Sequence, residues 1–330
     1  MVLQELFLTE KWMVPGKKIS ASRPNQPPTH RSGNHGPIPP LGVVRSFTVD
    51  FRADHFNSRC DLLLGSLKLM STLDHLWLSP SALDDRHSFI LLKECNFPQL
   101  IGCAILAPFS IFTTQQISDA VALFLAGHSN LKRFHIHSSV LASPSIRVSL
   151  PNLEYYEGNS ALIPTIHTNS LKEVHLTWCP QHAADVDQIV LRLDSMAKPG
   201  FPFVSSHRFL CASGNQTIMK VVTSVSKHMR HTKTLRLQAS QRQDILDHMT
   251  ECLPRFTGLV YLALQWTGSF LQPRVTKDRD EIVVEGWGNS CPTLEACCLN
   301  RCGWKKADGR WEKRHNRAFW ALAGLSATQY

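Results

Sequence analysis

A six-residue pattern recurs along the chain and constrains its fold more than any other feature. Each copy has apolar residues at its first, fourth and sixth positions, as in LDHLWL at 73–78 and LKEVHL at 171–176. The spacings between successive starts are 29, 27, 31, 22, 18, 61, 27 and 35 residues. Two copies are imperfect, because Gly158 and Thr232 occupy apolar positions. The nine copies begin at Val44, Leu73, Leu100, Leu131, Leu153, Leu171, Thr232, Leu259 and Leu294.

Segments with helical periodicity lie between these copies. Their apolar residues recur at three- and four-residue steps, which is typical of an amphipathic helix. Leucine-rich repeats run roughly 20–29 residues, so most of the spacings fit one strand followed by one helix. Helices are expected at 117–127, 185–196, 217–229, 243–253 and 280–287.

The pattern therefore predicts an α/β fold, a leucine-rich-repeat solenoid with a curved parallel sheet on its concave side and helices on its convex side. About nine or ten irregular repeats are expected over residues 43–302. The 61-residue step holds about two repeats, with a degenerate strand at SHRFLCA near Phe209. The 18-residue step is too short for a helix, and a plain loop is expected there.

The ninth position of each repeat gives a second test of the pattern. In leucine-rich repeats this position carries Asn, Cys or a small polar residue that bonds the backbone of the turn. Six of the nine residues found there are Ser, Thr or Cys, which supports the same fold. The nine are Arg52, Ser81, Pro108, Ser139, Ala161, Cys179, Ser240, Thr267 and Cys302.

The two ends of the chain differ from the repeats. Residues 1–42, rich in Pro, Gly, Ser and Asn from 15 onward, predict a disordered leader. Residues 303–330 predict either a basic C-terminal cap built on Trp304 and Trp311 or an exposed basic tail. The formal charge of +9 divides into +3 for 1–42, +1 for 43–300 and +5 for 301–330. This distribution does not favour nucleic-acid binding, which usually concentrates basic residues on one face.

The sequence also indicates a cellular compartment. The first residues, MVLQELFLTEKW, lack the pattern of a signal peptide. A membrane-spanning helix needs about 20 predominantly apolar residues, and no stretch of the sequence fits that description. The ten cysteines are scattered and favour reduced thiols. We expect a protein of the cytoplasm or nucleus with no membrane partner.

The same repeats predict a binding surface. Side chains alternate along a strand, so the third, fifth and seventh positions of each repeat face the concave surface. Exposed aromatic and Arg side chains dominate the energies of protein interfaces. We expect an unknown protein partner to contact this surface, through the residues Trp77, Arg133, His135, Tyr155, Glu173, His175, Arg236 and Tyr261.

Metal and catalytic sites are not expected. His135, His137 and His175 share the predicted surface, but the pattern places no carboxylate or Cys beside them, so an exposed polar group is favoured over zinc. Cys291, Cys297, Cys298 and Cys302 lack the paired C-x2-C spacing of zinc sites and are expected to be structural. Phosphate-binding loops, nucleophile elbows and H-E-x-x-H motifs are absent from the sequence. The sequence predicts no enzyme and no cofactor.

Several stretches resemble one family of repeat proteins. The most specific are LPNLEYYEGNSALIPTI at 150–166, SLKEVHLTW at 170–178, DVDQIVLRL at 185–193, WGNSCPTLEACCL at 287–299 and WKKADGRW at 304–311. On these stretches the chain is similar to the leucine-rich-repeat region of basidiomycete F-box proteins over about 43–315, and VVRSFTVDF at 43–51 resembles the usual first strand.

The resemblance implies a role in substrate recognition. In that family an F-box recruits the Skp-type adaptor of a cullin ubiquitin ligase, and the repeats hold the substrate. The F-box pattern is not visible in residues 1–42, so an adaptor is expected only if an F-box is encoded upstream. The alternative is a stand-alone repeat scaffold or inhibitor that has no connection to a ligase.

Overall fold

The structure is a computed structural model. It describes residues 45–49, 65, 67–78, 92–106, 115–137, 146–179, 184–210, 215–239, 243–266, 277–299 and 302–324. All of these belong to the second of two units, residues 40–330. The leader expected at 1–42 lies outside the described residues, as do six of the nine expected turn residues.

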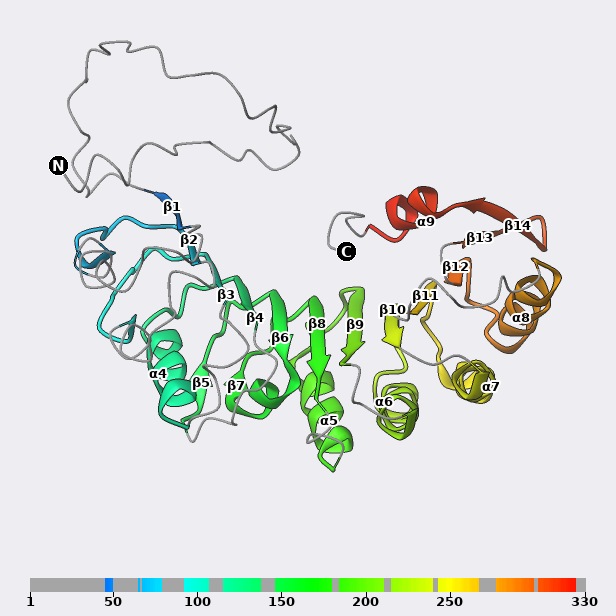
Figure 1. Cartoon of the computed structure of the whole chain (residues 1–330), viewed down its shortest axis with the longest axis horizontal. Coiled ribbons are helices and arrows are strands. Elements are labelled where there is room, and N and C mark those ends of the chain that lie inside the picture. Colours follow the sequence, from blue (N-terminus) through cyan, green and yellow to red (C-terminus); the bar gives the residue numbers. More distant parts are fainter. Residues whose placement is uncertain are drawn as a thin grey trace, which may run out of the picture. The chain divides into compact units, whose positions relative to one another are not determined.

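A sheet of twelve strands follows the order of the chain (Figure 1). Every pair from β1 to β12 is parallel. These strands are β1 (Ser46–Val49), β2 (His75–Leu78), β3 (Gly102–Leu106), β4 (Arg133–His137), β6 (Tyr155–Asn159), β8 (Glu173–Trp178), β9 (Phe203–Phe209), β10 (Thr232–Ala239), β11 (Tyr261–Trp266) and β12 (Ala296–Leu299). A strand is therefore present at each of the nine copies of the pattern, and β9 is the expected degenerate strand.

Helices lie between these strands and cover one face of the sheet (Figure 1). Consecutive helices from α5 to α8 contact one another. The bounds of five helices agree within a few residues with the ranges expected from the sequence. They are α4 (Gln115–Ala126), α5 (Val186–Met196), α6 (Asn215–His228), α7 (Gln243–Cys252) and α8 (Lys277–Ser290). A mixed α/β fold with a long parallel sheet is thus confirmed. We call the other side of the sheet the open face.

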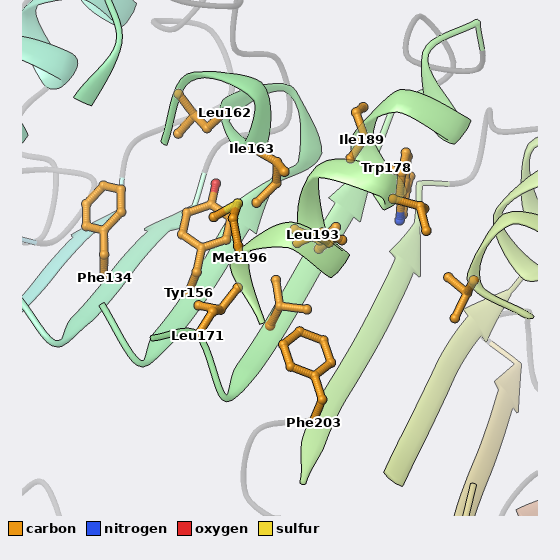
Figure 2. Close-up of a cluster of buried hydrophobic side chains, with 14 of the residues drawn as sticks. Phe134, Tyr156, Leu162, Ile163, Leu171, Trp178, Ile189, Leu193, Met196 and Phe203 are labelled. Carbon is orange, nitrogen blue, oxygen red and sulfur yellow. The ribbon is translucent and has the colours of Figure 1, made fainter. Parts of the chain in front are cut away.

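The main core lies between the sheet and these helices. The fourth and sixth positions of the repeats supply buried side chains such as Leu76, Phe134 and Val174. The residues Ile189, Leu193 and Met196 of α5 belong to the same core, and Figure 2 shows them on the same side of the sheet as Phe134 and Tyr156. Truncating a buried side chain of this kind to Ala typically costs about 2–5 kcal/mol. The apolar pattern therefore fixes which side of each strand carries the helices.

β9 keeps its place in the sheet although polar residues take the inward positions. Ser205 and His207 pair in register with Leu235 and Leu237 of β10, so they point toward the helices. The hydroxyl of Ser205 and one ring nitrogen of His207 are 2.9 Å apart, and the indole N–H of Trp178 donates to the other nitrogen at 3.0 Å. Buried polar groups with partners cost little, which explains how this strand tolerates the loss of its leucines.

The 18-residue step contains a short helix, so the expectation of a plain loop there is wrong. A 3-10 helix, η4 (Ser160–Thr165), follows β6 and buries Leu162 and Ile163 in the core. Asn159 caps it by accepting a hydrogen bond from the N–H of Ala161 at 2.9 Å. Next, β7 (Ile166–His167) pairs with β5 (Val148–Ser149) in a separate two-stranded sheet. One tight turn thus supplies the apolar side chains that an α-helix supplies elsewhere.

The sheet changes direction at its C-terminal end. β13 (Cys302–Ala307) pairs antiparallel with β12, and β14 (Arg310–His315) pairs antiparallel with β13. Cys302 therefore begins a strand and does not occupy the expected turn position. Trp304 is buried in the main core, whereas α9 (Asn316–Leu322) follows β14 and lies on the open face (Figure 1). The repeat pattern carries no information about this reversal, because no further copy follows Leu294.

α9 covers the open face of β11 and β12. Its Phe319 and Trp320 form a second cluster with Ala263, Ala296 and Cys298, all of them buried. The small side chains on the two strands leave room for the two rings. The open face is thus covered at this end by the chain itself.

Candidate functional site

Two rows of side chains cross the open face, because the strands pair in register. One row runs through Trp77, Ala104, His135, Glu157 and His175. The other runs through Arg133, Tyr155 and Glu173 on β4, β6 and β8. We call Trp77, Arg133, His135, Tyr155, Glu157, Glu173 and His175 the open-face cluster. It brings six of the eight sequence-predicted site residues together.

Trp77 reaches across a neighbouring strand to join this cluster. Its ring meets the ring of His135 edge to face, with the centroids 6.3 Å apart. Between them stands Ala104, whose methyl group is small enough to let the two rings meet. Edge-to-face aromatic pairs of this kind contribute about 0.5–1.5 kcal/mol. Trp77 is held in place on one side and still exposes 43% of its surface.

Glu157 links the two rows. Its carboxylate accepts a hydrogen bond from the hydroxyl of Tyr155 and lies 3.7 Å from Nε2 of His135. The expectation that no carboxylate lies beside the histidines is therefore wrong. The signal was available in the sequence, because parallel pairing of β4 with β6 in the repeat register places residue 157 beside residue 135.

The ring of Tyr155 connects the rest of the cluster. The guanidinium of Arg133 lies 5.9 Å from its centroid, and the ring of His175 lies 5.4 Å away on the next strand. His175 also contacts Glu173, with Nε2 and Oε1 2.7 Å apart. Arg133 is exposed and Tyr155 half-buried, but His175 is only 7% exposed. His175 therefore positions Tyr155 and Glu173 and presents little surface of its own.

Charges of both signs lie within the cluster. With neutral histidines, Arg133 contributes one positive charge and Glu157 and Glu173 two negative ones. The aromatic rings of Trp77 and Tyr155 separate these charges. Such a surface offers a partner apolar contact area and hydrogen-bonding groups of both kinds.

Arg236 and Tyr261 do not belong to this cluster, and the expectation that Arg236 is exposed is wrong. Arg236 is completely buried beneath α9, where its guanidinium lies 4.8 Å from the ring centroid of Trp320. It donates a 2.6 Å hydrogen bond to Oε1 of Gln265, and burial lowers its pKa to about 9. Tyr261 packs partly buried against the same α9 cluster. The sequence missed this because α9 lies outside the repeats.

Neither histidines nor cysteines form a metal centre within the part of the chain that the structure describes. The side chain of His137 lies outside that part. Cys291 and Cys297 are buried in the main core and Cys298 beneath α9. Burial raises the pKa of Cys298 to about 12 and that of Cys297 well above its usual value. Such thiols are poor nucleophiles and poor ligands.

A cleft of about 470 Å³ opens between α5 and α6, on the face opposite the cluster. Asp187, in its lining, accepts a 2.7 Å hydrogen bond from the hydroxyl of Ser224 and lies 3.1 Å from Nε2 of His228. Hydrogen bonding by Ser224 lowers the pKa of Asp187. Because Ser224 bonds to the carboxylate and not to the imidazole, the trio lacks the nucleophile–base contact of a hydrolase. It ties two helices together.

The chain matches no protein-family model, and the comparison with curated proteins gave no match. Among the described residues, no helix is both long and apolar enough to cross a membrane.

Proposed function

We propose that this chain is a leucine-rich-repeat solenoid that binds another protein through the open-face cluster. The repeat fold is supported by the strand at each of the nine copies of the pattern and by the helices α4 to α8 that lie between the strands and cover one face of the sheet. In such a solenoid the strands line the concave side, where partners bind. The proposal assigns the protein no catalytic role.

The observation that carries this proposal is the exposure of Trp77 within a network of fixed polar groups. Trp77 keeps 43% of its surface exposed while its ring is held against His135, so a large aromatic surface in a defined position is available to a partner. Interface hot spots are enriched in Trp, Tyr and Arg, and the cluster holds one of each in Trp77, Tyr155 and Arg133. The neighbouring contacts fix Trp77 and Tyr155 before binding, which lowers the entropy that binding costs.

A photocrosslinking aromatic residue such as benzoylphenylalanine, which keeps a large ring at position 77, tests this proposal. The full chain would be incubated with a lysate of the source cells, and crosslinked proteins would be identified by mass spectrometry. We expect one dominant product from position 77 and none of it from position 123, since Leu123 is 46% exposed but lies on α4, on the helix-covered face. Competition by unlabelled wild-type chain, but not by Trp77→Ala, should remove the product. Equal products from both positions would contradict the proposal.

The resemblance to F-box proteins extends the proposal to substrate recognition for a ubiquitin ligase. It predicts that the protein, expressed from its full gene, co-purifies with a Skp-type adaptor and that the adaptor remains bound in Trp77→Ala. A stand-alone scaffold or inhibitor predicts the same crosslink from position 77 with no adaptor. The two arms separate the binding role from the ligase connection.

A further inference from the structure

A second surface lies along the N-terminal ends of the parallel strands. The residue before each of the strands β4, β6 and β8 donates its N–H to the carbonyl of the equivalent residue before the preceding strand. Lys132 bonds to Ile101 at 2.8 Å, Glu154 to Lys132 at 2.9 Å, and Lys172 to Glu154 at 2.9 Å. Neighbouring strands lie about 4.8 Å apart, so these side chains form a close row. The open-face cluster does not include them.

A tight turn adds two more residues to this row. The N–H of Lys198 bonds to the carbonyl of Leu171 at 2.8 Å, and the N–H of Phe201 closes a turn on the carbonyl of Lys198 at 3.3 Å. Pro199 and Gly200, whose φ is 75°, occupy the two central positions, which is the pattern of a type II turn. Pro199 fixes its own φ, and Gly200 adopts the positive φ of the turn without strain, so Phe201 is presented in a defined position. We call Lys132, Lys172, Lys198 and Phe201 the basic edge.

Phe201 is exposed but not isolated. Half of its surface meets solvent, and the ammonium groups of Lys198 and Lys172 lie 4.2 and 5.3 Å from its ring centroid. An ammonium within about 6 Å of a ring centroid makes a favourable cation–π contact. The ring thus holds two flexible lysines in one place and gives their charges a defined position.

The three lysines act together on a single carboxylate. Glu154 lies 3.0 Å from Nζ of Lys172, and its pKa is lowered by that hydrogen bond, with further contributions from the charges of Lys172, Lys132 and Lys198. Within the described part of the chain, Lys132 and Lys198 make no ion pair with another acid. Three positive charges against one negative leave the basic edge and Glu154 together with a net charge of +2.

We propose that the basic edge binds an acidic, extended segment of a partner protein. Glu154 already shows that a carboxylate is stabilised at this place, and a ligand carboxylate beside Lys132 and Lys198 would be stabilised in the same way. A nucleic acid fits less well, because the lysines lie over the ring of Phe201, where a base would have to stack. The free edge of the ring is suited to an apolar side chain of the segment.

Fluorescence anisotropy with the full chain tests this proposal. The probe is a fluorescein-labelled peptide of alternating Asp and Glu with one central Phe. Its Asn/Gln counterpart and a single-stranded DNA of equal charge serve as comparisons. We expect the acidic peptide alone to bind, with an affinity that falls as salt is raised and falls about tenfold or more in Lys198→Glu. Lys198→Gln, which adds no repulsion, should show a smaller loss in the same direction.

Lys313→Glu is the matched control, since Lys313 is an exposed lysine on β14 far along the sheet from the basic edge. An equal loss in Lys313→Glu would show that only net charge matters and would overturn the proposal. So would tighter binding of the DNA, or no binding of the acidic peptide. Circular dichroism verifies that each variant is folded. Trp77→Ala should bind the peptide normally, which separates this surface from the open-face cluster.

Discussion

The indole N–H of Trp178 donates a hydrogen bond to Nδ1 of His207, and both side chains are completely buried. Because Nδ1 accepts, the proton of the neutral ring is on Nε2, which donates to the hydroxyl of Ser205. Both ring nitrogens are therefore satisfied only while the imidazole is neutral. Burial, with a smaller effect of His175, lowers the pKa of His207 to about 3.

We expect this histidine to make the fold sensitive to acid. Below pH of about 6.5 the unfolded chain binds a proton at His207 that the native state excludes until pH of about 3. The free energy of unfolding should therefore decrease as the pH is lowered from about 6.5 to about 3, by up to about 1.4 kcal/mol per pH unit. Urea denaturation at a series of pH values measures the slope.

His207→Gln is the control for this prediction, because Gln can donate and accept but does not titrate. Its slope should be shallower, whatever its stability at neutral pH. A residual slope is expected from His128, whose pKa is also lowered by burial. Equal slopes in the two proteins would contradict the assignment.

Local sequence predicted most of the sheet because each strand repeats the same alternation. Phe134 and Leu262 are buried where the pattern places them, and their neighbours Arg133 and Tyr261 point the other way. β9 was harder to locate, since His207 depends on a partner 29 residues away in the sequence. Contacts of that kind leave no local periodicity.

The same reasoning explains which part of the candidate site was predicted. The open-face cluster depends only on register, and register follows from the repeats. The burial of Arg236 depends on α9. This helix follows an antiparallel hairpin that the repeat pattern does not predict. The basic edge was missed because Lys132 and Lys172 occupy the second position of their repeats, which alternation alone does not assign to either face. Lys198 and Phe201 lie in the turn before β9, outside the nine copies of the pattern.

Gly158 occupies a position where the pattern expects an apolar residue, and the reason is steric. A Cβ at this position would lie 2.6 Å from Cγ2 of Ile136 and 2.7 Å from the hydroxyl of Tyr156, whose large side chain fills the space. Gly158→Ala should therefore destabilise the protein, by roughly 1–3 kcal/mol, as overpacking does.

Gly286→Ala is the matched control for Gly158→Ala. Gly286 lies inside α8, with nothing within 4 Å of an added Cβ, so Ala should stabilise the helix by up to about 1 kcal/mol. Thermal unfolding of both variants measures the difference. Destabilisation of equal size in the two would indicate a backbone effect and refute the steric account.

Glu157 should matter for binding more than for stability. Its carboxylate is partly exposed, and ion pairs of that kind contribute about 0–1 kcal/mol. Glu157→Ala should leave the melting temperature nearly unchanged but remove the acceptor of the Tyr155 hydroxyl and the contact with His135, and the crosslink from position 77 should weaken. A variant with a much lower melting temperature and an intact crosslink would show that Glu157 contributes to stability and not to binding.

Cys297 and Cys298 are neighbours in β12 but lie on opposite faces of the sheet. Cys297 belongs to the main core, and Cys298 lies beneath α9, where its thiol donates to Oδ1 of Asn316 at 3.7 Å. Opening of α9 alone would expose Cys298, whereas Cys297 becomes accessible only when the sheet separates from its helices. The two thiols therefore report on two different opening reactions.

Trp320→Ala should accelerate alkylation of Cys298 by about tenfold or more without changing that of Cys297. The indole covers Arg236 and fills much of the second cluster, and truncation of a buried Trp typically costs about 3–5 kcal/mol, enough to populate an opened α9. Iodoacetamide labelling under native conditions, read by fragment ions in mass spectrometry, distinguishes the adjacent cysteines. Leu322→Ala, on the same helix but 41% exposed, should behave as wild type. Equal acceleration at both cysteines would mean that α9 is part of one cooperative fold and does not open by itself.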